Sequence, residues 1–134
     1  MAITDDTIRR FYEHYGQTLT SGKPETISAC YLAPALVVGD HGTTPIADIA
    51  EVAAFFEGSA ERYAAEGLVG AVPTVVNTEQ LTDTLVSVDV HWDYTDGDGV
   101  SQSEDGYRYL LRQTFDGLRI QVVIATPERL KRGT

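Results

Sequence analysis

The sequence has one cysteine, one tryptophan and few basic residues. A single cysteine, Cys30, cannot form a disulfide within the chain, and this usage is typical of proteins in a reducing compartment. Ten Lys and Arg stand against twenty Asp and Glu, which gives a formal net charge of −10. Nucleic-acid binding requires a basic patch that neutralises phosphates, so we expect no nucleic-acid partner.

Long apolar runs are also missing. No run approaches the roughly 18 residues of a membrane-spanning helix, so we expect no membrane partner. The first residues, Met1–Asp6, lack the basic and apolar regions of a signal peptide, from which we expect a cytoplasmic protein. No phosphate-binding glycine loop or dinucleotide fingerprint is present, and we expect no cofactor. We expect residues 1–134 to form one domain with a single core.

The first half of the chain predicts helices. Apolar residues with helical spacing form a stripe near the N-terminus: Ile8, Phe11, Tyr12, Tyr15 and Leu19. Thr4 or Asp5 can cap this helix, and Gly22 ends it. A short helix from Pro24 to Tyr31 follows, and a longer one is predicted over 47–66.

The second half alternates between apolar and polar residues, as strands do. After a brief strand at Leu36–Val38, we predict a strand from Val72 to Leu81 and three long strands between about Leu85 and Thr126. In the first long strand the inward-facing residues are Val86, Val88, Val90, Trp92 and Tyr94. Helices followed by an antiparallel meander predict the α+β class, with a curved sheet wrapped around helices and a cone-shaped cavity at one end.

The turn Asp116-Gly117 predicts the last hairpin and its register. The predicted register pairs Phe115 with Leu118 and gives the neighbouring strand an inner face of Tyr107, Tyr109, Leu111, Gln113 and Phe115. The outer face then carries Leu85, Leu110, Val123 and Ala125 among Arg108, Arg112 and Gln121. An apolar centre with a polar rim is typical of a subunit interface, so we expect a homodimer.

Local patterns in this order resemble one family. They are Tyr15–Gly22, the segment Cys30–Asp40, the spaced Ile49 and Phe56, and the closing meander. Together they resemble the nuclear transport factor 2-like superfamily, which includes ketosteroid isomerases and SnoaL-like polyketide cyclases. The resemblance implies a cone-shaped, cystatin-like roll in which a curved antiparallel sheet encloses an apolar pocket.

The resemblance also implies roles for two residues. In ketosteroid isomerases an aspartate after the first strand shuttles a proton, and a tyrosine of the first helix holds the enolate oxygen. These roles fall on Asp40 and Tyr15. The late-strand acid of that family falls near Leu111, and the nearby Gln113 is a weaker donor. From the residues alone, Asp40 also fits an ordinary turn aspartate and Tyr15 an ordinary core tyrosine.

These observations lead to two hypotheses for function. The first is binding of an apolar or aromatic small molecule, with cofactor-free isomerisation, cyclisation or dehydration through Asp40 and Tyr15 as the chemistry that the resemblance allows. The second is a non-catalytic dimeric association or scaffold module. The predicted cavity is lined by Phe11, Tyr15, Tyr31, Asp40, Phe56, Trp92, Tyr107, Tyr109 and Gln113. We interpret the row Asp89, His91 and Asp93 as solvated or interfacial polar residues, and expect no metal site.

Overall fold

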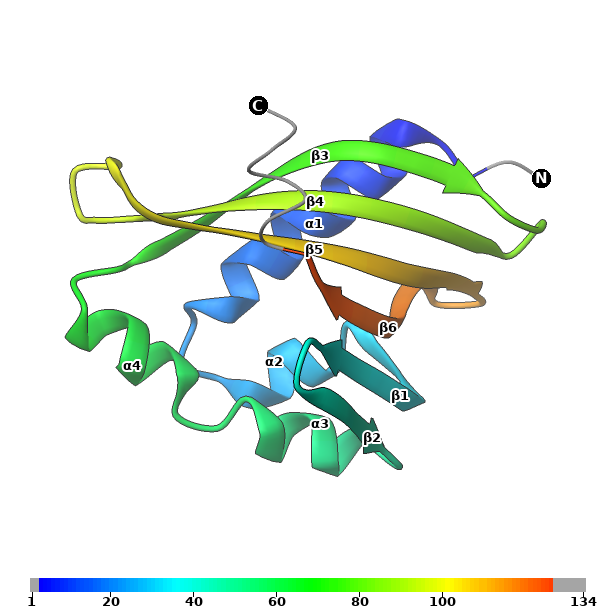
Figure 1. Cartoon of the computed structure of the whole chain (residues 1–134), viewed down its shortest axis with the longest axis horizontal. Helices are drawn as coiled ribbons and strands as arrows, with labels where there is room; N and C mark the ends of the chain where they lie inside the picture. The colour runs from blue at the N-terminus through cyan, green and yellow to red at the C-terminus, as the bar shows by residue number, and fades with distance from the viewer. Residues whose placement is uncertain (1–2, 127–134) are drawn as a thin grey trace.

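The computed structural model describes residues 3–126, in which helices line one side of a single sheet (Figure 1). The helices are α1 (Asp5–Leu19), α2 (Pro24–Ser28), α3 (Ile49–Phe55) and α4 (Ser59–Ala65). The strands are β1 (Tyr31–Gly39), β2 (Gly42–Ile46), β3 (Gly70–Gln80), β4 (Leu85–Thr95), β5 (Ser101–Thr114) and β6 (Gly117–Ala125).

The sheet has the strand order β2-β1-β6-β5-β4-β3 and does not close into a barrel. The β1–β6 pair is parallel and the other neighbours are antiparallel. In Figure 1, β3, β4 and β5 sweep across the molecule with α1 behind them, while α3 lies beside β1 and β2 and α4 lies farther to the left. The predicted α+β class with a curved sheet around N-terminal helices is confirmed. Among residues 3–126, no helix has the length and apolar character needed to cross a membrane.

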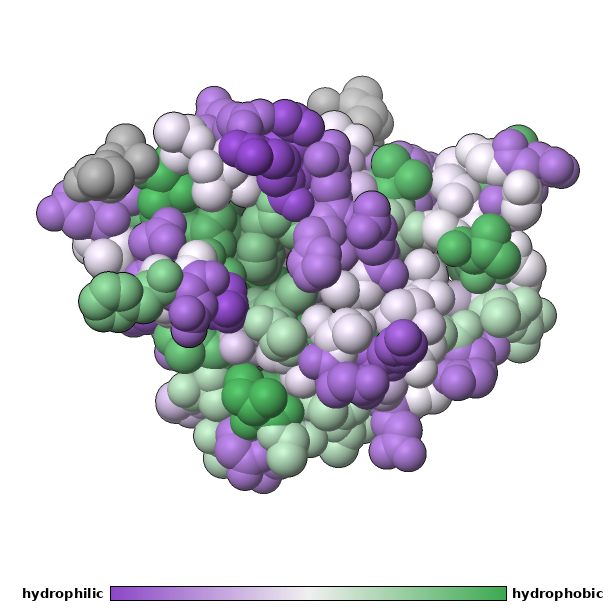
Figure 2. Space-filling view, turned by 180° about the vertical axis from the view of Figure 1, so that it is seen from behind, coloured by the Kyte–Doolittle hydropathy of each residue, from purple (hydrophilic) through white to green (hydrophobic). Residues whose placement is uncertain are grey.

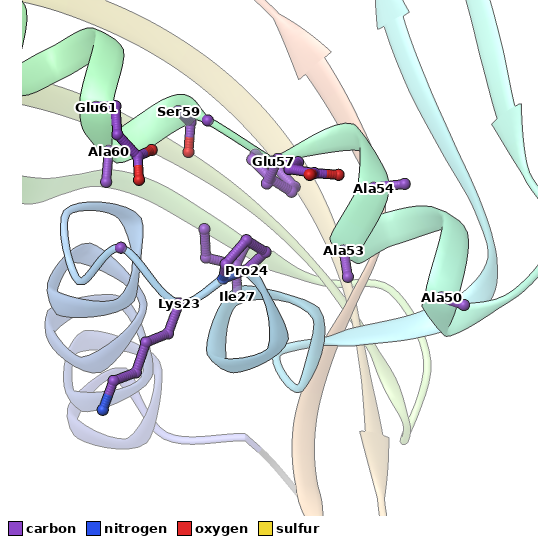
Figure 3. Close-up of a pocket in the computed structure, with 13 residues that line it drawn as sticks. Lys23, Pro24, Ile27, Ala50, Ala53, Ala54, Glu57, Ser59, Ala60 and Glu61 are labelled. Atoms are coloured by element: carbon purple, nitrogen blue, oxygen red, sulfur yellow. The ribbon is translucent and has the colours of Figure 1, made fainter.

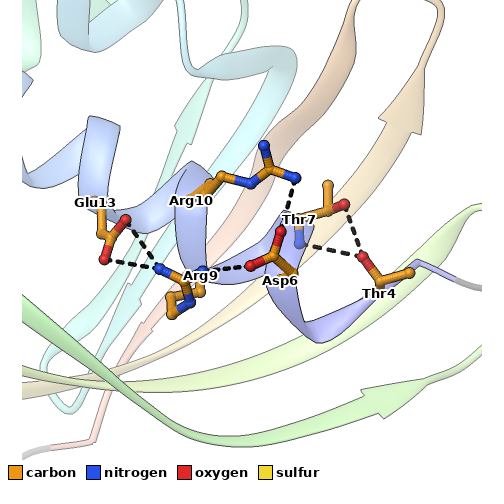
Figure 4. A network of polar contacts seen from close by, with 6 residues as sticks. All are labelled: Thr4, Asp6, Thr7, Arg9, Arg10 and Glu13. Carbon is orange, nitrogen blue, oxygen red and sulfur yellow. Dashed lines mark hydrogen bonds and ion pairs between the residues drawn. The ribbon is translucent and has the colours of Figure 1, made fainter.

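Helix α1 begins where the sequence predicts. The Thr4 side chain accepts a hydrogen bond from the Thr7 amide at 3.2 Å, which satisfies one of the free amides of the first turn. On the exposed face Asp6 pairs with Arg9 and, at 2.7 Å, with Arg10 (Figure 4). Figure 2 shows the molecule from behind, where hydrophilic side chains gather at the upper centre, hydrophobic surface is recessed to their left, and separate hydrophobic side chains stand out elsewhere. The exposed ion pairs that Asp6 forms with Arg9 and Arg10 keep the surface of α1 polar and add little stability.

The opposite face of α1 is buried against the sheet. Ile8, Tyr12 and Tyr15 are all at most 3% exposed, as the predicted apolar stripe requires. Gly16 allows close approach, because a Cβ there would lie 2.6 Å from the Ala71 carbonyl oxygen and 3.1 Å from the Trp92 ring. The missing side chain therefore lets the helix rest directly on the indole of Trp92.

The helix predicted over 47–66 is in fact two helices. Its first half, α3, is capped by the Asp48 side chain, which accepts from the Glu51 amide at 2.9 Å. Gly58 then adopts a left-handed backbone with φ of 80°, which an α-helix interior cannot contain. The apolar spacing continued across this glycine, so the periodicity alone did not reveal the break.

The first strand is longer than predicted and forms a hairpin with β2, which the sequence reading missed. Strand β1 begins at Tyr31, where a short helix was predicted to end. Gly39 pairs with Gly42, so Asp40 and His41 form a two-residue turn between the strands. The register between β1 and β6 shifts between Tyr31 and Leu36, which explains why the alternation in this segment is hard to follow.

The predicted inner face of β4 is confirmed, but the register of the last hairpin was wrong. Leu118 pairs with Gln113, not with Phe115, which lies fully exposed at the turn. A further register shift between Leu110 and Leu111 turns Val123 inward, opposite Tyr109. The predicted outward position of Val123 is therefore corrected, because the sequence reading did not include this bulge.

Candidate functional site

A small cavity of about 140 Å³ lies inside the cone, between α1, the sheet and the α3–α4 segment. Aromatic rings make up most of its wall. Its lining residues are Tyr15, Leu19, Tyr31, Val37, Phe55, Phe56, Tyr63, Trp92, Tyr94, Tyr107, Tyr109 and Val123. They come from α1, from the α3–α4 segment and from β1, β4, β5 and β6, so elements from both halves of the chain build it.

Two buried hydrogen bonds organise the polar atoms of this wall. The hydroxyls of Tyr15 and Tyr31 are 2.7 Å apart, and either one can donate to the other. The indole nitrogen of Trp92 donates to the hydroxyl of Tyr109 at 2.9 Å. A phenol that accepts in this way still has its own proton to donate. The wall can therefore offer donors to a polar atom placed in the cavity.

The cavity environment keeps these phenols neutral. Burial raises the pKa of Tyr15 and of Tyr109 well above that of an exposed tyrosine, and it raises the pKa of Tyr31 in the same direction. Among the described residues that line the cavity, none has a side chain that is charged at neutral pH. The site therefore offers apolar surface and neutral hydrogen-bond donors, and it disfavours an ionised guest.

Tyr12 adds an unusual feature beneath this wall. Its side chain is completely buried, and its hydroxyl has no hydrogen-bond partner among the described residues. Its ring lies 5.0 Å from that of Tyr109, measured between centroids. A buried hydroxyl without a partner costs free energy, so this atom is a natural place for a bound water or a polar ligand atom.

Asp105 is the residue near the cavity that the sequence reading missed. It lies opposite Trp92 in the β4–β5 pair, on the inner face and half-buried. Its carboxylate accepts a hydrogen bond from the hydroxyl of Tyr107 at 3.1 Å. The signal was available, because Asp105 is two residues before the inward-facing Tyr107 and strand alternation puts both on one face.

The structure brings most of the predicted site residues together. Those that line the cavity are Tyr15, Tyr31, Phe56, Trp92, Tyr107 and Tyr109. Phe11 packs beside them, with its ring stacked on that of Tyr15 at 6.4 Å between centroids. The position implied for a late-strand acid, Leu111, is a fully buried core residue.

Asp40 and Gln113 do not lie where the resemblance implied. Asp40 is exposed in the β1–β2 turn and is not among the residues that line the cavity. Gln113 is exposed near the β5–β6 turn, and its side chain donates to the Thr114 carbonyl at 3.1 Å. Both expected positions are corrected, because each residue lies at the end of a hairpin, outside the enclosed part of the sheet.

Two larger hollows lie on the outside of the molecule. A groove of about 490 Å³ separates α2 from α3 and α4, and alanines and Glu57 form much of its upper wall (Figure 3). Another, of about 670 Å³, lies between α1 and β3. Both are more open than the inner cavity, and neither has its aromatic wall. We therefore take the inner cavity as the candidate site.

A family model described as NTF2-like protein (DUF6841) matches residues 5–128 of the chain. The chain belongs to this NTF2-like family. The match covers every helix and strand described above, which confirms the family resemblance of the sequence. No protein of curated function matches the chain.

Solved structures share the fold of this NTF2-like protein at low sequence identity. One is a domain of unknown function with a cystatin-like fold from Nostoc punctiforme, at a TM-score of 0.70 and 18% identity, covering 96% of this chain and 82% of the other. An NTF2-like protein from Novosphingobium aromaticivorans has a TM-score of 0.66 and 18% identity, covering 91% and 80%. Aln2 from a Streptomyces species has a TM-score of 0.70 and 16% identity, covering 100% of both chains.

Proposed function

We propose that this NTF2-like protein binds a small, neutral ring-shaped molecule that carries a hydrogen-bond acceptor, such as a ketone. The observation that carries the proposal is the aromatic cavity with paired phenol hydroxyls in its wall. Aromatic rings provide apolar contact area, and the phenols of Tyr15 and Tyr31 provide a donor at a fixed place.

The size of the cavity limits the ligand. An apolar cavity of roughly 150 Å³ admits benzene. The cavity here, of about 140 Å³, therefore matches a molecule with one six-membered ring. A larger ligand would need the α3–α4 segment to move, because Phe55 and Phe56 form part of the wall.

The charge of the cavity limits the ligand further. A carboxylate or phenolate placed there would lose its hydration and find no cation among the described lining residues. A neutral acceptor loses less hydration and gains a hydrogen bond from a phenol. The proposal does not include proton transfer by Asp40, because that residue lies outside the cavity.

Acetophenone and benzoate form a matched pair of probes, since both have one ring and a carbonyl oxygen but only benzoate is charged. Trp92 is the only tryptophan, so its indole N–H gives one resonance that can be followed by NMR during titration. Acetophenone should shift this resonance in a saturable way, and benzoate should not. Equal binding of both probes, or of neither, would contradict the proposal.

Two variants test whether the probe lies in the cavity. Val37→Phe puts a larger side chain into the cavity and should abolish acetophenone binding. Val76→Phe makes the same change at a position that is 54% exposed on β3 and should leave binding unchanged. Tyr31→Phe removes one hydroxyl and should weaken binding by about fivefold, the value of one neutral hydrogen bond. An intact affinity in Val37→Phe would place the probe elsewhere.

We also propose that two copies of the chain associate through the outer face of the sheet. Apolar residues lie half-buried or exposed there: Leu36, Leu85, Leu110, Val122 and Ile124. Arg108 and Arg112 lie on the same face, and a mixture of apolar and arginine side chains is typical of a subunit interface. The same patch meeting itself about a two-fold axis buries these apolar side chains in both copies.

Sedimentation at micromolar concentration tests this association. The wild-type protein should sediment with twice the mass of one chain. Leu110→Asp puts a charge in the apolar centre and should give a folded monomer. Phe115→Asp makes the same kind of change at a fully exposed turn and should leave the dimer intact. A monomeric wild-type protein would exclude the association.

A further inference from the structure

A second cluster of chemical interest lies on the outer face of the sheet, away from the aromatic cavity. His91 and Asp93 are two residues apart on β4, so their side chains share a face. Glu104 lies directly opposite Asp93 on β5. One ligand atom from each of these three side chains lies within 4.8 Å of the others.

The distances within this cluster suit a metal ion. The Nε2 atom of His91 is 3.0 Å from Oε1 of Glu104 and 3.6 Å from Oδ2 of Asp93. Ligand atoms at about 2.0 Å from a tetrahedral zinc ion are about 3.3 Å from one another. The two observed separations lie on either side of this value, so small side-chain movements would complete the coordination.

Without a cation the cluster has an unfavourable pairing. Asp93 and Glu104 are carboxylates directly opposite each other on neighbouring strands, and like charges in that position destabilise a sheet. The overall charge of −10 adds to the negative potential around them. A divalent cation between the two carboxylates would convert this repulsion into attraction on both sides.

One of the carboxylates is already held in place. The hydroxyl of Ser101 donates to Oδ1 of Asp93 at 2.8 Å, and the other oxygen, Oδ2, faces His91. A hydrogen bond to the outer oxygen of a metal-binding carboxylate orients the inner one. Ser101 thus occupies the position of a supporting residue behind a metal ligand.

We propose that His91, Asp93 and Glu104 bind a divalent transition-metal ion, with zinc as the best match. One imidazole and two carboxylates are donors that zinc accepts, and three protein ligands leave a coordination position for water. The sequence row of Asp89, His91 and Asp93 did not reveal this set. Asp89 is engaged by Arg108 at 2.8 Å, and the third ligand comes from the neighbouring strand.

Zinc binding to the untagged full chain, freed of metal by a chelator, tests the proposal by calorimetry. The wild-type protein should bind one zinc ion per chain. His91→Ala and Glu104→Gln should abolish this binding, and Ser101→Ala should weaken it by about tenfold, as the loss of a supporting hydrogen bond does. Glu104 is 56% exposed, so its variant is expected to fold normally.

Two control variants separate a specific site from loose attraction to an acidic surface. His41→Ala removes a histidine from the exposed β1–β2 turn, and Glu79→Gln removes an exposed carboxylate from β3. Both should bind zinc as the wild-type protein does. Absence of stoichiometric binding to the wild-type protein, or undiminished binding to His91→Ala, would overturn the proposal and leave an ordinary ion pair.

Discussion

The two faces of β4 are built from alternate residues of one strand, yet they differ in every chemical respect. Val88, Val90 and Trp92 point inward and are fully buried. The residues that alternate with them, Asp89, His91 and Asp93, point outward. In the cavity wall, the polar atoms are neutral phenols and an indole that bond to one another, and the half-buried carboxylate of Asp105 lies beside that wall. Outside, the polar groups are carboxylates and an imidazole that contact groups on β5.

The difference follows from the cost of removing charge from water. A buried hydroxyl loses little when it finds one hydrogen bond, whereas a buried carboxylate needs a partner of opposite charge. Asp89 is consistent with this rule, because its side chain is only 4% exposed and Arg108 binds it with two nitrogens. Neutral pairs can therefore line a cavity that admits a guest, whereas the charged pair of Asp89 and Arg108 lies on the outer face of the sheet.

High pH should have the largest effect on the difference between the two faces, because it ionises tyrosine hydroxyls that are neutral in the cavity wall. Burial raises the pKa of Tyr12, Tyr15, Tyr31 and Tyr109 in the folded protein. The unfolded chain ionises near the ordinary value of about 10, so the stability that these phenols contribute is complete below that pH and is lost as the pH rises above it. The loss at pH about 11 should be roughly 1.4 kcal/mol per buried tyrosine.

Phenolate absorbance measured against pH checks this expectation. The phenolate signal should appear in a steep step that coincides with loss of the circular dichroism of the fold. A gradual titration centred near pH ~10 in a protein that stays folded would contradict it, since that curve describes exposed tyrosines.

A carboxylate on the inner face should have the next largest effect. Val88 is fully buried, so Val88→Asp should lower the free energy of unfolding by about 4 kcal/mol or prevent folding. Val76→Asp makes the same change at a position 54% exposed and should cost no more than about 0.5 kcal/mol. Urea denaturation measures the free energy of unfolding of both variants. Similar decreases in the two would show that a carboxylate costs no more on the inner face than at an exposed position.

The ion pair of the outer face should rank third. Arg108→Met leaves the carboxylate of Asp89 without its guanidinium and should cost about 2 kcal/mol, the value of a hydrogen bond to a charged group. Arg112→Met removes a similar arginine whose partner is the neutral amide oxygen of Gln121, at 2.8 Å, and should cost about 1 kcal/mol. Equal losses would show that the charge of Asp89 does not matter.

The same contrast explains how much the sequence could predict. The stripe of α1 and the alternation of β4 are periodic patterns within one element, and both were predicted correctly. The break at Gly58 was missed because the apolar spacing runs through it. The inward turn of Val123 depends on a bulge in the β5–β6 pair, which the period of two conceals.

The sites show the same division. The aromatic residues of the cavity were largely predictable, since each lies on an apolar face of its own element. Glu104 was not singled out, because its role depends on which β4 residue lies opposite it. Cross-strand partners require the register, and the register was the least accurate part of the sequence reading.

Asp40→Asn should have the smallest effect, because it removes a charge that lies outside the cavity. Asp40 lies exposed in the two-residue turn between β1 and β2, outside the residues that line the cavity. The substitution keeps the shape of the side chain, so stability should change by less than about 0.5 kcal/mol. Acetophenone affinity, followed through the Trp92 resonance, should remain unchanged, whereas Tyr31→Phe should reduce it. A loss of acetophenone affinity in Asp40→Asn would mean that the β1–β2 turn folds over the bound molecule. A charged side chain would then contact the ligand at that end of the cone, and the cavity wall could no longer be described as neutral there.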